Sequence, residues 1–470
     1  MSRVHSFTDD ALADHDAVSL AAAIAEGLPV ADVVDAAIAR AEALDPSLNA
    51  VAHPAYEQAR AEALAPKPGF FAGVPTFLKD NVVVAGMPSS HGADAFEPKR
   101  ASADGDFARM FRATGLLPLG LSRMSEYGFS GASDHPRLGA VPTPWNTGHY
   151  AGASSAGAGA MVAAGVVPLA HGNDGGGSIR IPAAVNGLVG LKPTRNRLAQ
   201  DKMFRDMPVR IVSDGVLTRS VRDTAAFFRE AEKVWRNPRL APIGDITRPG
   251  RSRLKIAVVT QSVGRDSTPE VRELTLGVAA RLEELGHQVE EIAPPVPSFF
   301  PDHFLLYWSM LSLFLVSTGR REHGASWAPE NLDSLTLGLA KHCRRNLHKL
   351  PVATATMAAS KHAAAKHHAT YDVTLTPTLA METPPVGFLR GDLPYETIMD
   401  RLLDWVAFTP LQNASGEPAI SLPLATTAKG LPHGMMFGAA AGREARLLEL
   451  AYELEEAFEW PRLGTPETTA

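Results

Sequence analysis

Short apolar runs alternate with amphipathic segments along most of this chain. Alanine-rich segments at 9–26 and 31–44 carry Leu, Val and Ile at three- and four-residue spacings, which predicts two helices separated by Gly27 and Pro29. Short apolar runs bounded by Gly, Pro or polar residues predict strands. We expect strands near 77–79, 116–121, 166–170, 254–260, 287–292, 371–377, 418–423 and 435–439, and helices at 106–114, 156–165, 268–286, through most of 301–370 and at 443–457. This alternation predicts an α/β fold.

Three polar segments interrupt the alternation. A polar loop covers 125–150, and the irregular segment 195–215 is long for a connection, a feature that is often functional. The segment 235–252 is rich in Pro and Arg, which is typical of a surface linker. We expect 1–65 to form a helical N-terminal arm and 66–470 to form the α/β domain.

Composition narrows the classes of function. The chain has 470 residues, 45% of them hydrophobic, and a formal net charge of −6, which argues against a nucleic-acid partner. Its one cysteine, Cys343, excludes an internal disulfide, is expected to be structural, and fits a reducing compartment such as the cytoplasm. The acidic N-terminus shows no targeting segment. The apolar run 304–318 is shorter than the ~20 residues that span a bilayer, so a buried helix is expected and no membrane contact.

The stretch from Gly152 to Pro193 is crowded with Gly and Ala and holds the serines Ser154, Ser155 and Ser178. Gly175-Gly176-Gly177 directly precedes Ser178, and a run of unobstructed backbone N–H groups can curl into a pocket for negative charge. Ser178 is then placed like a nucleophile beside its own oxyanion hole. The alternative is a Gly-rich turn that caps a helix starting near Ser178, and spacing alone leaves both interpretations open.

Several common sites are missing from the sequence. It contains no G-x-S-x-G nucleophile elbow, no phosphate-binding loop, no G-x-G-x-x-G between a strand and a helix, and no H-E-x-x-H zinc motif. His362, His367 and His368 fall in one predicted helix, but their spacing with no carboxylate partner favours a solvated helix face over a metal site. We therefore expect no metal and no cofactor.

Lys79 follows the apolar residues Phe77 and Leu78 at the end of a predicted strand. A lysine there is usually a surface residue, and its ordinary pKa of ~10.4 makes it a poor base near pH 7. A catalytic role requires burial, which lowers the pKa of a lysine by several units. It also requires the carboxylate of Asp80 to point elsewhere, because a nearby negative charge would raise the pKa of the lysine again.

Four motifs together resemble the amidase signature family, in that family's order and over nearly the whole chain. Ser178 follows Ser154 by 24 positions, as in the paired serines of the family. The segment 73–81 resembles the strand of the catalytic lysine, and 190–194 and 416–423 match as well. The resemblance implies one large α/β domain with a mixed central sheet flanked by helices, and a signature core at about 73–195.

The resemblance also implies a mechanism, a Ser–cisSer–Lys triad. Lys79 is the unprotonated base, Ser154 bridges after a cis peptide bond, and Ser178 attacks the amide carbonyl to form an acyl-enzyme that water hydrolyses. The N–H groups of Gly175, Gly176, Gly177 and Ser178 are the expected oxyanion hole, with Ser155, Asp174 and Arg180 in support.

Other implied features are less direct. Helices after residue 300 line the acyl side of the pocket in the family, which makes Phe304, Tyr307, Trp308 and Phe314 candidate substrate contacts. The family favours Gly-Gly-Ser-Ser-Gly-Gly, whereas this chain has Ala153 and Ala156 around its serines, and the two added methyl groups narrow the loop.

The expected function is therefore hydrolysis of a linear carboxamide to a carboxylic acid and an amine or ammonia. The partner is a small-molecule amide, and a homodimer is one possible assembly. Three alternatives stay open: the A subunit of a tRNA-dependent amidotransferase, which needs partner subunits; a binding or scaffolding protein that lost activity; and a cyclic-amide hydrolase similar to the branch that opens 6-aminohexanoate cyclic dimer. The last rests on the segments 170–174 and 408–416.

Overall fold

Eight strands form one twisted mixed sheet through the middle of the molecule. The computed structural model describes residues 2–464. In spatial order the strands are β12 (Gln288–Glu291), β11 (Lys255–Val258), β13 (Val373–Pro377), β15 (Pro432–Ala439), β14 (Ala419–Thr426), β9 (Val189–Lys192), β10 (Ser213–Thr218) and β8 (Leu169–Asp174). Only the pairings of β11 with β12 and with β13 are parallel, and all the others in this sheet are antiparallel.

A smaller sheet lies beside β8 and carries the lysine strand. Its order is β1 (Val51–Pro54), β3 (Leu117–Ser122) and β2 (Pro75–Lys79), with β2 parallel to β3. Two short ribbons complete the strands: β4 (Asp134–His135) with β5 (Gly139–Ala140), and β6 (Pro142–Thr143) with β7 (Asn146–Tyr150).

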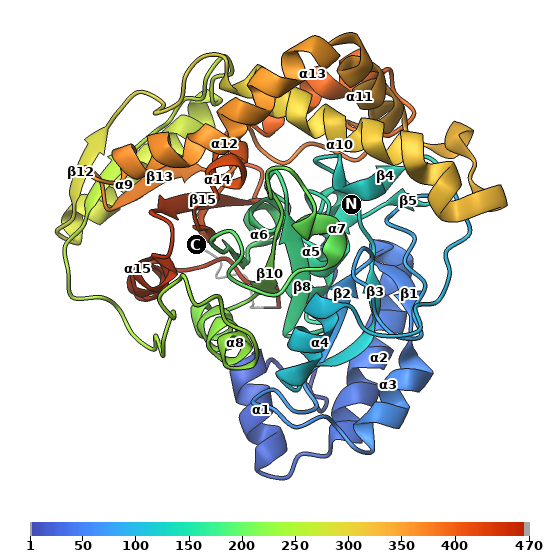
Figure 1. The fold of residues 1–470 in the computed structure, drawn as a ribbon. Helices are drawn as coiled ribbons and strands as arrows, with labels where there is room; N and C mark the ends of the chain where they lie inside the picture. Colours follow the sequence, from blue (N-terminus) through green and yellow to red (C-terminus); the bar gives the residue numbers. More distant parts are fainter. Residues whose placement is uncertain (1, 465–470) are drawn as a thin grey trace.

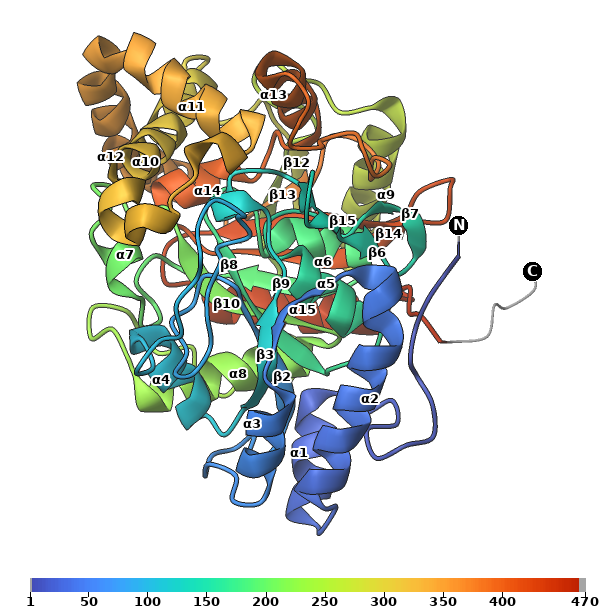
Figure 2. The ribbon, with the colours of Figure 1, turned by 90° about the vertical axis from the view of Figure 1, so that its right-hand side faces the viewer.

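Helices cover the sheets on several sides (Figures 1 and 2). Around the sheets lie α1 (Ala17–Ala25), α2 (Val30–Leu48), α3 (Tyr56–Ala63), α4 (Asp106–Ala113), α5 (Ala156–Ala163), α6 (Arg180–Asn186), α7 (Lys202–Arg205), α8 (Val221–Val234), α9 (Pro269–Glu284), α14 (Pro410–Ser415) and α15 (Glu444–Ala457). Four more helices lie together at the top of Figure 1, and we name them the cap: α10 (Phe300–His323), α11 (Ser334–Arg345), α12 (Leu350–His367) and α13 (Tyr395–Trp405). The mixed sheet flanked by helices in one domain confirms the predicted fold class.

The Gly- and Ala-rich helix α5 is buried along its whole length. A Cβ added at Gly157 would lie 2.5 Å from the carbonyl oxygen of Ala50, and one at Gly159 would lie 2.8 Å from Asn186 Nδ2. Only glycine permits this close approach. The small residues that the sequence concentrates around Ser154 thus let α5 pack directly against its neighbours and place the serines at its N-terminus.

Some elements differ from the prediction. The segment 195–215 was expected to be irregular, but β10 begins within it at Ser213 and pairs with β8 and β9. Its central Gly and its polar ends hide the strand pattern, because both faces of the strand are buried and no alternation shows. The β8 strand begins at Leu169, three residues later than expected. Helices α3, α13 and α14 were not predicted either.

The N-terminal segment contributes to the folded core. Helices α1–α3 lie together at the bottom of Figures 1 and 2, and β1 pairs with β3 in the smaller sheet. Val33, Val34 and Ile38 of α2 are fully buried. The boundary at residue 65 between an arm and the α/β domain stays a prediction.

The apolar run at 304–318 lies in the 24-residue helix α10, as expected, but the helix is only partly buried. Phe314 is 63% exposed, because α10 belongs to the cap and one of its faces looks outward. Within residues 2–464, the structure contains no helix with the length and apolar character needed to cross a membrane.

Candidate active site

Lys79 is fully buried at the end of β2, next to the end of β8. Its Nζ lies 2.6 Å from Ser154 Oγ and 2.7 Å from Asn173 Oδ1. Burial lowers the pKa of the lysine from 10.5 to about 7, although the carboxylates of Asp174 and Asp214 act in the opposite direction. The lysine therefore meets the requirement that the sequence left open.

The neighbouring carboxylate of Asp80 turns away from Lys79. It accepts hydrogen bonds from the backbone N–H groups of Ser90, at 2.9 Å, and Gly92, at 3.1 Å, and from the Ser90 hydroxyl. Because successive side chains of an extended segment point to opposite sides, the lysine and the carboxylate separate. This confirms the expected orientation of Asp80.

Ser154 lies between the lysine and Ser178. Its hydroxyl contacts Lys79 Nζ, and its backbone N–H donates to Ser178 Oγ at 3.3 Å. The neighbouring Ser155 is buried, and its hydroxyl donates to the backbone oxygen of Asn173 at 3.3 Å. The structure therefore brings Lys79, Ser154 and Ser178 into one chain of contacts, with Ser155 holding the end of β8.

One implied feature of Ser154 is wrong. The family resemblance implies a cis peptide bond before this serine, but every peptide bond within residues 2–464 is trans, including the bond from Ala153 to Ser154.

The loop from Gly175 to Ser178 is held by the carboxylate of Asp174. Asp174 Oδ1 accepts the N–H of Gly177 at 2.8 Å, and Oδ2 accepts that of Ile179 at 3.2 Å. Gly177 itself has φ +136, a conformation that favours glycine. In the described part of the chain, the N–H groups of Gly175, Gly176 and Ser178 donate to no protein atom. The structure therefore differs from the prediction at Gly177, whose N–H is occupied, and leaves the other three predicted donors open.

Arg180 holds Asp174 in place through a fully buried ion pair. The guanidinium donates to both carboxylate oxygens, at 2.8 and 2.9 Å. Burial raises the pKa of Asp174, but the charge and hydrogen bonds of Arg180, the charge of Lys192 and the hydrogen bond from Asn413 together outweigh burial and hold that pKa well below its ordinary value. The guanidinium also donates to Asn413 Oδ1 at 2.7 Å and to the Thr409 carbonyl at 2.8 Å, which ties the loop to α14. Both side chains are fully buried, so the pair is not the plain surface ion pair that the sequence alone also allows.

Sequence reasoning missed the polar residues that hold the lysine. Asn173 Oδ1 accepts from Lys79 Nζ, and its amide nitrogen donates to Asn81 Oδ1 at 2.9 Å. His171 Nδ1 accepts the backbone N–H of Lys79 at 3.2 Å, so its Nε2 carries the proton and faces Asp214 at 3.2 Å. The signal that could have identified them was their position in the sequence: Asn81 follows the lysine by two residues, and Asn173 is the last residue but one of β8, just before the Gly loop.

Ser178 opens on a cavity of about 410 Å³ between the Gly loop and the cap. Most of its wall is apolar, and Phe304 and Trp308 of α10 belong to it, as expected. Two other candidates do not line it: Phe314 points outward, and Tyr307 is buried with its hydroxyl donating to the carbonyl of Val209 at 2.7 Å. One helix cannot present all four rings to the same side: at about 100° per residue, Tyr307 and Phe314 turn about 60° and 80° away from Phe304 in one direction, whereas Trp308 turns about 40° in the other.

The histidines of α12 divide between two environments. His362 is exposed, in agreement with the prediction of a solvated face. That prediction is wrong for His367 and His368, which are half-buried and line the cavity. His367 Nε2 lies 2.7 Å from Thr374 Oγ1, and His368 Nε2 lies 3.5 Å from the carboxylate of Glu417. They add a polar side to an otherwise apolar cavity.

Comparisons with known proteins agree with this geometry. A sequence model of the family described as Amidase matches residues 32–448. The chain is 59% identical to a protein of Mycobacterium tuberculosis named "Putative amidase AmiC", covering 99% of each chain. It is 33% identical to the 6-aminohexanoate-cyclic-dimer hydrolase of a Pseudomonas species, covering 93% of this chain and 94% of that one. A solved structure of a 6-aminohexanoate cyclic dimer hydrolase superposes with a TM-score of 0.85 at 30% identity, covering 96% and 98% of the two chains.

The family match extends over most of the chain, and the similarity to the relatives runs nearly from end to end. The buried lysine, the two serines in contact and the apolar cavity above them provide the chemistry that amide hydrolysis needs. This chain therefore belongs to the amidase family, whose members hydrolyse carbon–nitrogen bonds of carboxamides.

Proposed function

We propose that this amidase works through a Ser178 acyl-enzyme, with Lys79 as the base and Ser154 as the proton relay. The observation that carries the proposal is the contact chain itself: Lys79 Nζ lies 2.6 Å from Ser154 Oγ, and Ser154 N–H donates to Ser178 Oγ. Ser178 is the member of this chain that lines the cavity.

The surroundings of Lys79 suit the neutral amine. Asn173 offers it two acceptors, Oδ1 at 2.7 Å and the backbone oxygen at 3.3 Å. When both N–H groups of a neutral amine are used there, its lone pair is left for the hydroxyl of Ser154. With a pKa of about 7, half of the lysine is neutral at pH 7, whereas an ordinary lysine would be neutral in only about one molecule in 3,000.

In the first half of the reaction, Ser178 Oγ attacks the amide carbonyl carbon. Its proton passes to Ser154 Oγ while the Ser154 proton passes to the lone pair of Lys79. The negative charge of the tetrahedral intermediate falls on the former carbonyl oxygen, within reach of the open N–H groups of Gly175, Gly176 and Ser178. One such donor typically contributes about 3 kcal/mol to the transition state.

The same relay then runs in reverse. The Lys79 ammonium returns its proton through Ser154 to the leaving nitrogen, the C–N bond breaks, and an amine or ammonia departs. Water next attacks the ester of Ser178, its proton passing along the relay, and the carboxylic acid is released with Ser178 regenerated. Ser178, Ser154, Lys79 and the attacking water together account for every proton that is transferred.

The experiment that tests the proposal uses the purified chain alone. We expect it to hydrolyse an aryl amide such as a hexanoyl p-nitroanilide with no added partner, metal or cofactor, and a fluorophosphonate to label one serine, identified by mass spectrometry as Ser178. Hydrolysis that requires added partner subunits would favour the amidotransferase alternative. A folded protein that neither hydrolyses amides nor takes the label would favour the inactive scaffold.

The cavity supports a substrate with an apolar acyl part. Aromatic and aliphatic side chains of the cap surround the space above Ser178, and they bury apolar surface at about 25 cal/mol per Å². A cyclic amide remains the alternative substrate, because one relative is a 6-aminohexanoate-cyclic-dimer hydrolase. A paired assay of linear amides and cyclic amides of equal carbon number separates the two: preferential turnover of the cyclic series would contradict the linear preference.

Trp308→Ala should reduce hydrolysis of apolar amides selectively. Trp308 packs against Phe129 and Phe304 at the cavity wall, with ring centroids 5.4 and 6.0 Å away. Losing this contact area should lower kcat/KM for a hexanoyl amide by about tenfold or more, with a much smaller effect on an acetyl amide. Phe314→Ala is the matched control, because Phe314 lies on the exposed face of the same helix. Equal losses for both substrates would contradict the assignment of Trp308 to the acyl pocket.

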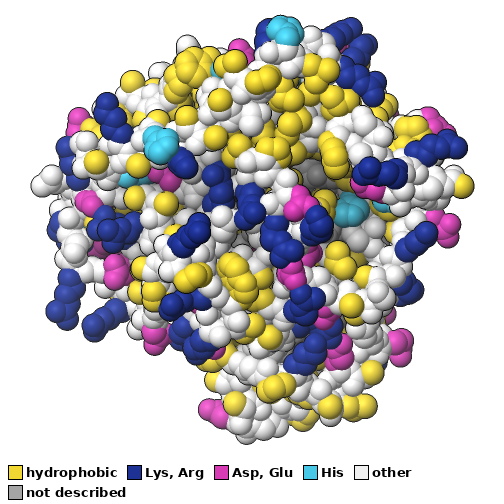
Figure 3. All heavy atoms as spheres, viewed as in Figure 1, with side chains coloured by type: hydrophobic (Ala, Val, Ile, Leu, Met, Phe, Trp, Pro, Cys, Tyr) yellow, Lys and Arg dark blue, Asp and Glu magenta, His cyan; other side chains and the backbone are white. Residues whose placement is uncertain are grey.

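Two features beyond the chemistry are also proposals. The single, buried and unpaired Cys343 supports a cytoplasmic location, where thiols stay reduced. Hydrophobic side chains gather at the top of Figure 3, where the cap lies in Figure 1. Phe314 of α10, Val352 of α12 and Leu347 of the turn before α12 are more than half exposed, which supports a homodimer formed through the cap. Light scattering after size-exclusion chromatography should give about twice the 50.0 kDa chain mass; the mass of one chain would contradict it.

A further inference from the structure

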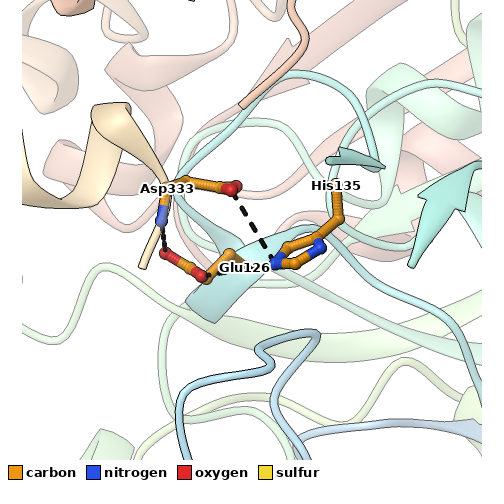
Figure 4. A group of neighbouring side chains, drawn as sticks. All are labelled: Glu126, His135 and Asp333. Carbon is orange, nitrogen blue, oxygen red and sulfur yellow. Dashed lines mark hydrogen bonds and ion pairs between the residues drawn. The ribbon is translucent and has the colours of Figure 1, made fainter. Parts of the chain in front are cut away.

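Two buried polar side chains and one half-buried one converge behind the wall of the active-site cavity. Figure 4 shows Glu126, His135 and Asp333 pointing toward one another from three separate segments. Glu126 begins the short turn after β3, His135 ends β4, and Asp333 is the N-cap residue of α11. One nitrogen or oxygen atom from each residue lies within 4.8 Å of the other two.

These three atoms are too far apart to bond directly. His135 Nε2 lies 3.8 Å from Glu126 Oε2 and 3.8 Å from Asp333 Oδ1, beyond hydrogen-bond length. Within residues 2–464 none of the three atoms has any other hydrogen-bond partner. Glu126 and His135 are 3% and 6% exposed, so bulk water does not satisfy them either. A cavity of about 10 Å³ borders all three residues, which is the space that one water molecule needs.

The tautomer of His135 decides what this cavity can hold. His135 Nδ1 accepts the backbone N–H groups of Arg137 and Leu138, each at 3.1 Å, so Nδ1 carries a lone pair and the proton of the neutral ring lies on Nε2. A metal ion requires the opposite arrangement, in which Nε2 is the ligand and the second ring N–H is a donor. A water molecule fits when one of the two carboxyl groups carries a proton: it accepts from Nε2–H and from that carboxyl group, and it donates to the ionised carboxylate.

We propose that Glu126, His135 and Asp333 hold one water molecule and one shared proton, and that this site positions the active-site loop 125–131 against the cap. The inference rests on the proposed active site. Glu126 already joins the two parts, since its Oε1 accepts the backbone N–H of Asp333 at 2.9 Å and the hydroxyl of Thr336 at 2.6 Å. The shared proton keeps the facing oxygens of the two carboxyl groups from repelling each other.

The loop touches the catalytic relay directly. A Cβ added at Gly128 would lie 3.4 Å from Ser154 Oγ, so this turn packs against the relay serine. Ser130 borders both the small cavity and the large one. Phe129 packs on Trp308 of the cap, and Tyr127 has φ +48, which few non-glycine residues adopt. A shift of the loop at Glu126 would therefore reach both Ser154 and the substrate wall.

The electrostatic surroundings favour a retained proton. Burial, followed by the charge of Asp333, raises the pKa of Glu126 to about 8, and burial also raises the pKa of Asp333. Burial lowers the pKa of His135, which keeps the ring neutral. Several charged and titratable groups face the cluster from the elements packed on it. Arg137 favours ionised carboxylates, Arg123 favours a neutral His135, and the others are Asp94, Tyr127, Asp134 and Asp392.

The direction of the pH effect follows from these shifts. A carboxyl group whose pKa is raised on folding stabilises the folded site most at low pH, and that stabilisation is lost as the pH rises from about 4.5 to about 8. Above pH 8 both carboxylates are ionised and repel across the small cavity. The loop then loosens from α11, and turnover falls at alkaline pH.

The test compares pH–rate profiles of the wild type, Glu126→Gln and Asp333→Asn. In the wild type, activity should rise through pH about 7 as Lys79 loses its proton, and fall about tenfold from its plateau by pH 9 as the shared proton leaves. Glu126→Gln keeps the Oε1 acceptor and supplies a neutral donor, so the alkaline fall should disappear while the rise near pH 7 stays. Asp333→Asn, a good helix N-cap, should do the same.

Glu455→Gln is the matched control. Its carboxyl group is half-buried and burial also raises its pKa, but it accepts from the Val221 N–H, between α8 and α15, and borders neither cavity. It should keep the alkaline fall. An unchanged alkaline fall in folded Glu126→Gln and Asp333→Asn would overturn the proposal, as would one equivalent of bound metal in the wild type that Glu126→Gln lacks. If the rate of the wild type does not rise near pH 7, that result would instead contradict the role of Lys79 as the base.

Discussion

Ser178→Ala is expected to lower kcat for an aryl amide by roughly 10⁴- to 10⁶-fold, with the fold unchanged. Ser178 Oγ is the side-chain oxygen of the contact chain that faces the cavity, and without it no acyl-enzyme forms. The serine is 7% exposed, and its Oγ accepts one long backbone hydrogen bond, so alanine fits the same space. The measurement is the single-turnover and steady-state rate of p-nitroaniline release, together with the melting temperature of each variant.

Ser155→Ala is the matched control for this prediction. The hydroxyl of Ser155 is one residue from the relay serine, but it donates to the backbone of Asn173 and lies away from the cavity. We expect a far smaller loss of kcat than for Ser178→Ala, and retained fluorophosphonate labelling. A folded Ser178→Ala protein that keeps substantial burst-phase turnover would contradict the assignment of the nucleophile.

Lys79→Met should lower kcat/KM by about 10³-fold or more and remove the rise of the rate with pH that comes from deprotonation of the lysine. In the wild type the protonated lysine cannot accept a proton, so the rate should be low below pH 7, rise through about pH 7 and reach a plateau. Methionine has a similar length and no charge, so it fills the buried site without a desolvation cost. The measurement is kcat/KM from pH 5 to 8.

Lys192→Met controls for the loss of a buried lysine as such. Lys192 is also buried and burial lowers its pKa to about 7, but its Nζ donates to the carbonyl of Pro193 and touches neither serine. It should retain most of the activity and the rise near pH 7. Similar losses in both variants would show that the effect of Lys79 is structural, and a wild-type rate that stays flat from pH 5 to 8 would contradict a lysine base.

The features that the sequence predicted correctly depend on neighbouring residues, whereas the features that it missed depend on contacts between residues far apart in the chain. Alternation of apolar runs and helical segments predicted the α/β class, because both patterns are local and depend on neighbouring positions. The strand β10 was not predicted, because it is buried on both faces and its pairing partners in β8 lie between 39 (Ser213 with Asp174) and 49 (Thr218 with Leu169) residues earlier in the chain. The roles of Asn413 and Thr409 were not predicted for the same reason, because they accept hydrogen bonds from Arg180, which lies more than 220 residues earlier in the chain.

The candidate site shows the same division at finer scale. Lys79, Ser154 and Ser178 were identified by motif, and their proximity follows from the packing of β2, α5 and the loop after β8. No motif shows that the N–H of Gly177 is already occupied, because this depends on how the carboxylate of Asp174 is oriented to accept it. Similarly, the helical spacing of the rings in α10 indicates which residues share a face, but only the packing of the cap decides which face looks into the cavity.

The sequence by itself determined the family and the α/β class and singled out the lysine and the serines as candidates for catalysis, because these depend on residue types at short, ordered spacings. Tertiary structure alone decided that Lys79 has a pKa near 7, that three N–H groups stay open beside Ser178, and that Glu126, His135 and Asp333 meet. The physical reason is that desolvation, hydrogen-bond occupancy and charge proximity depend on distances between segments far apart in the chain, which no local pattern specifies.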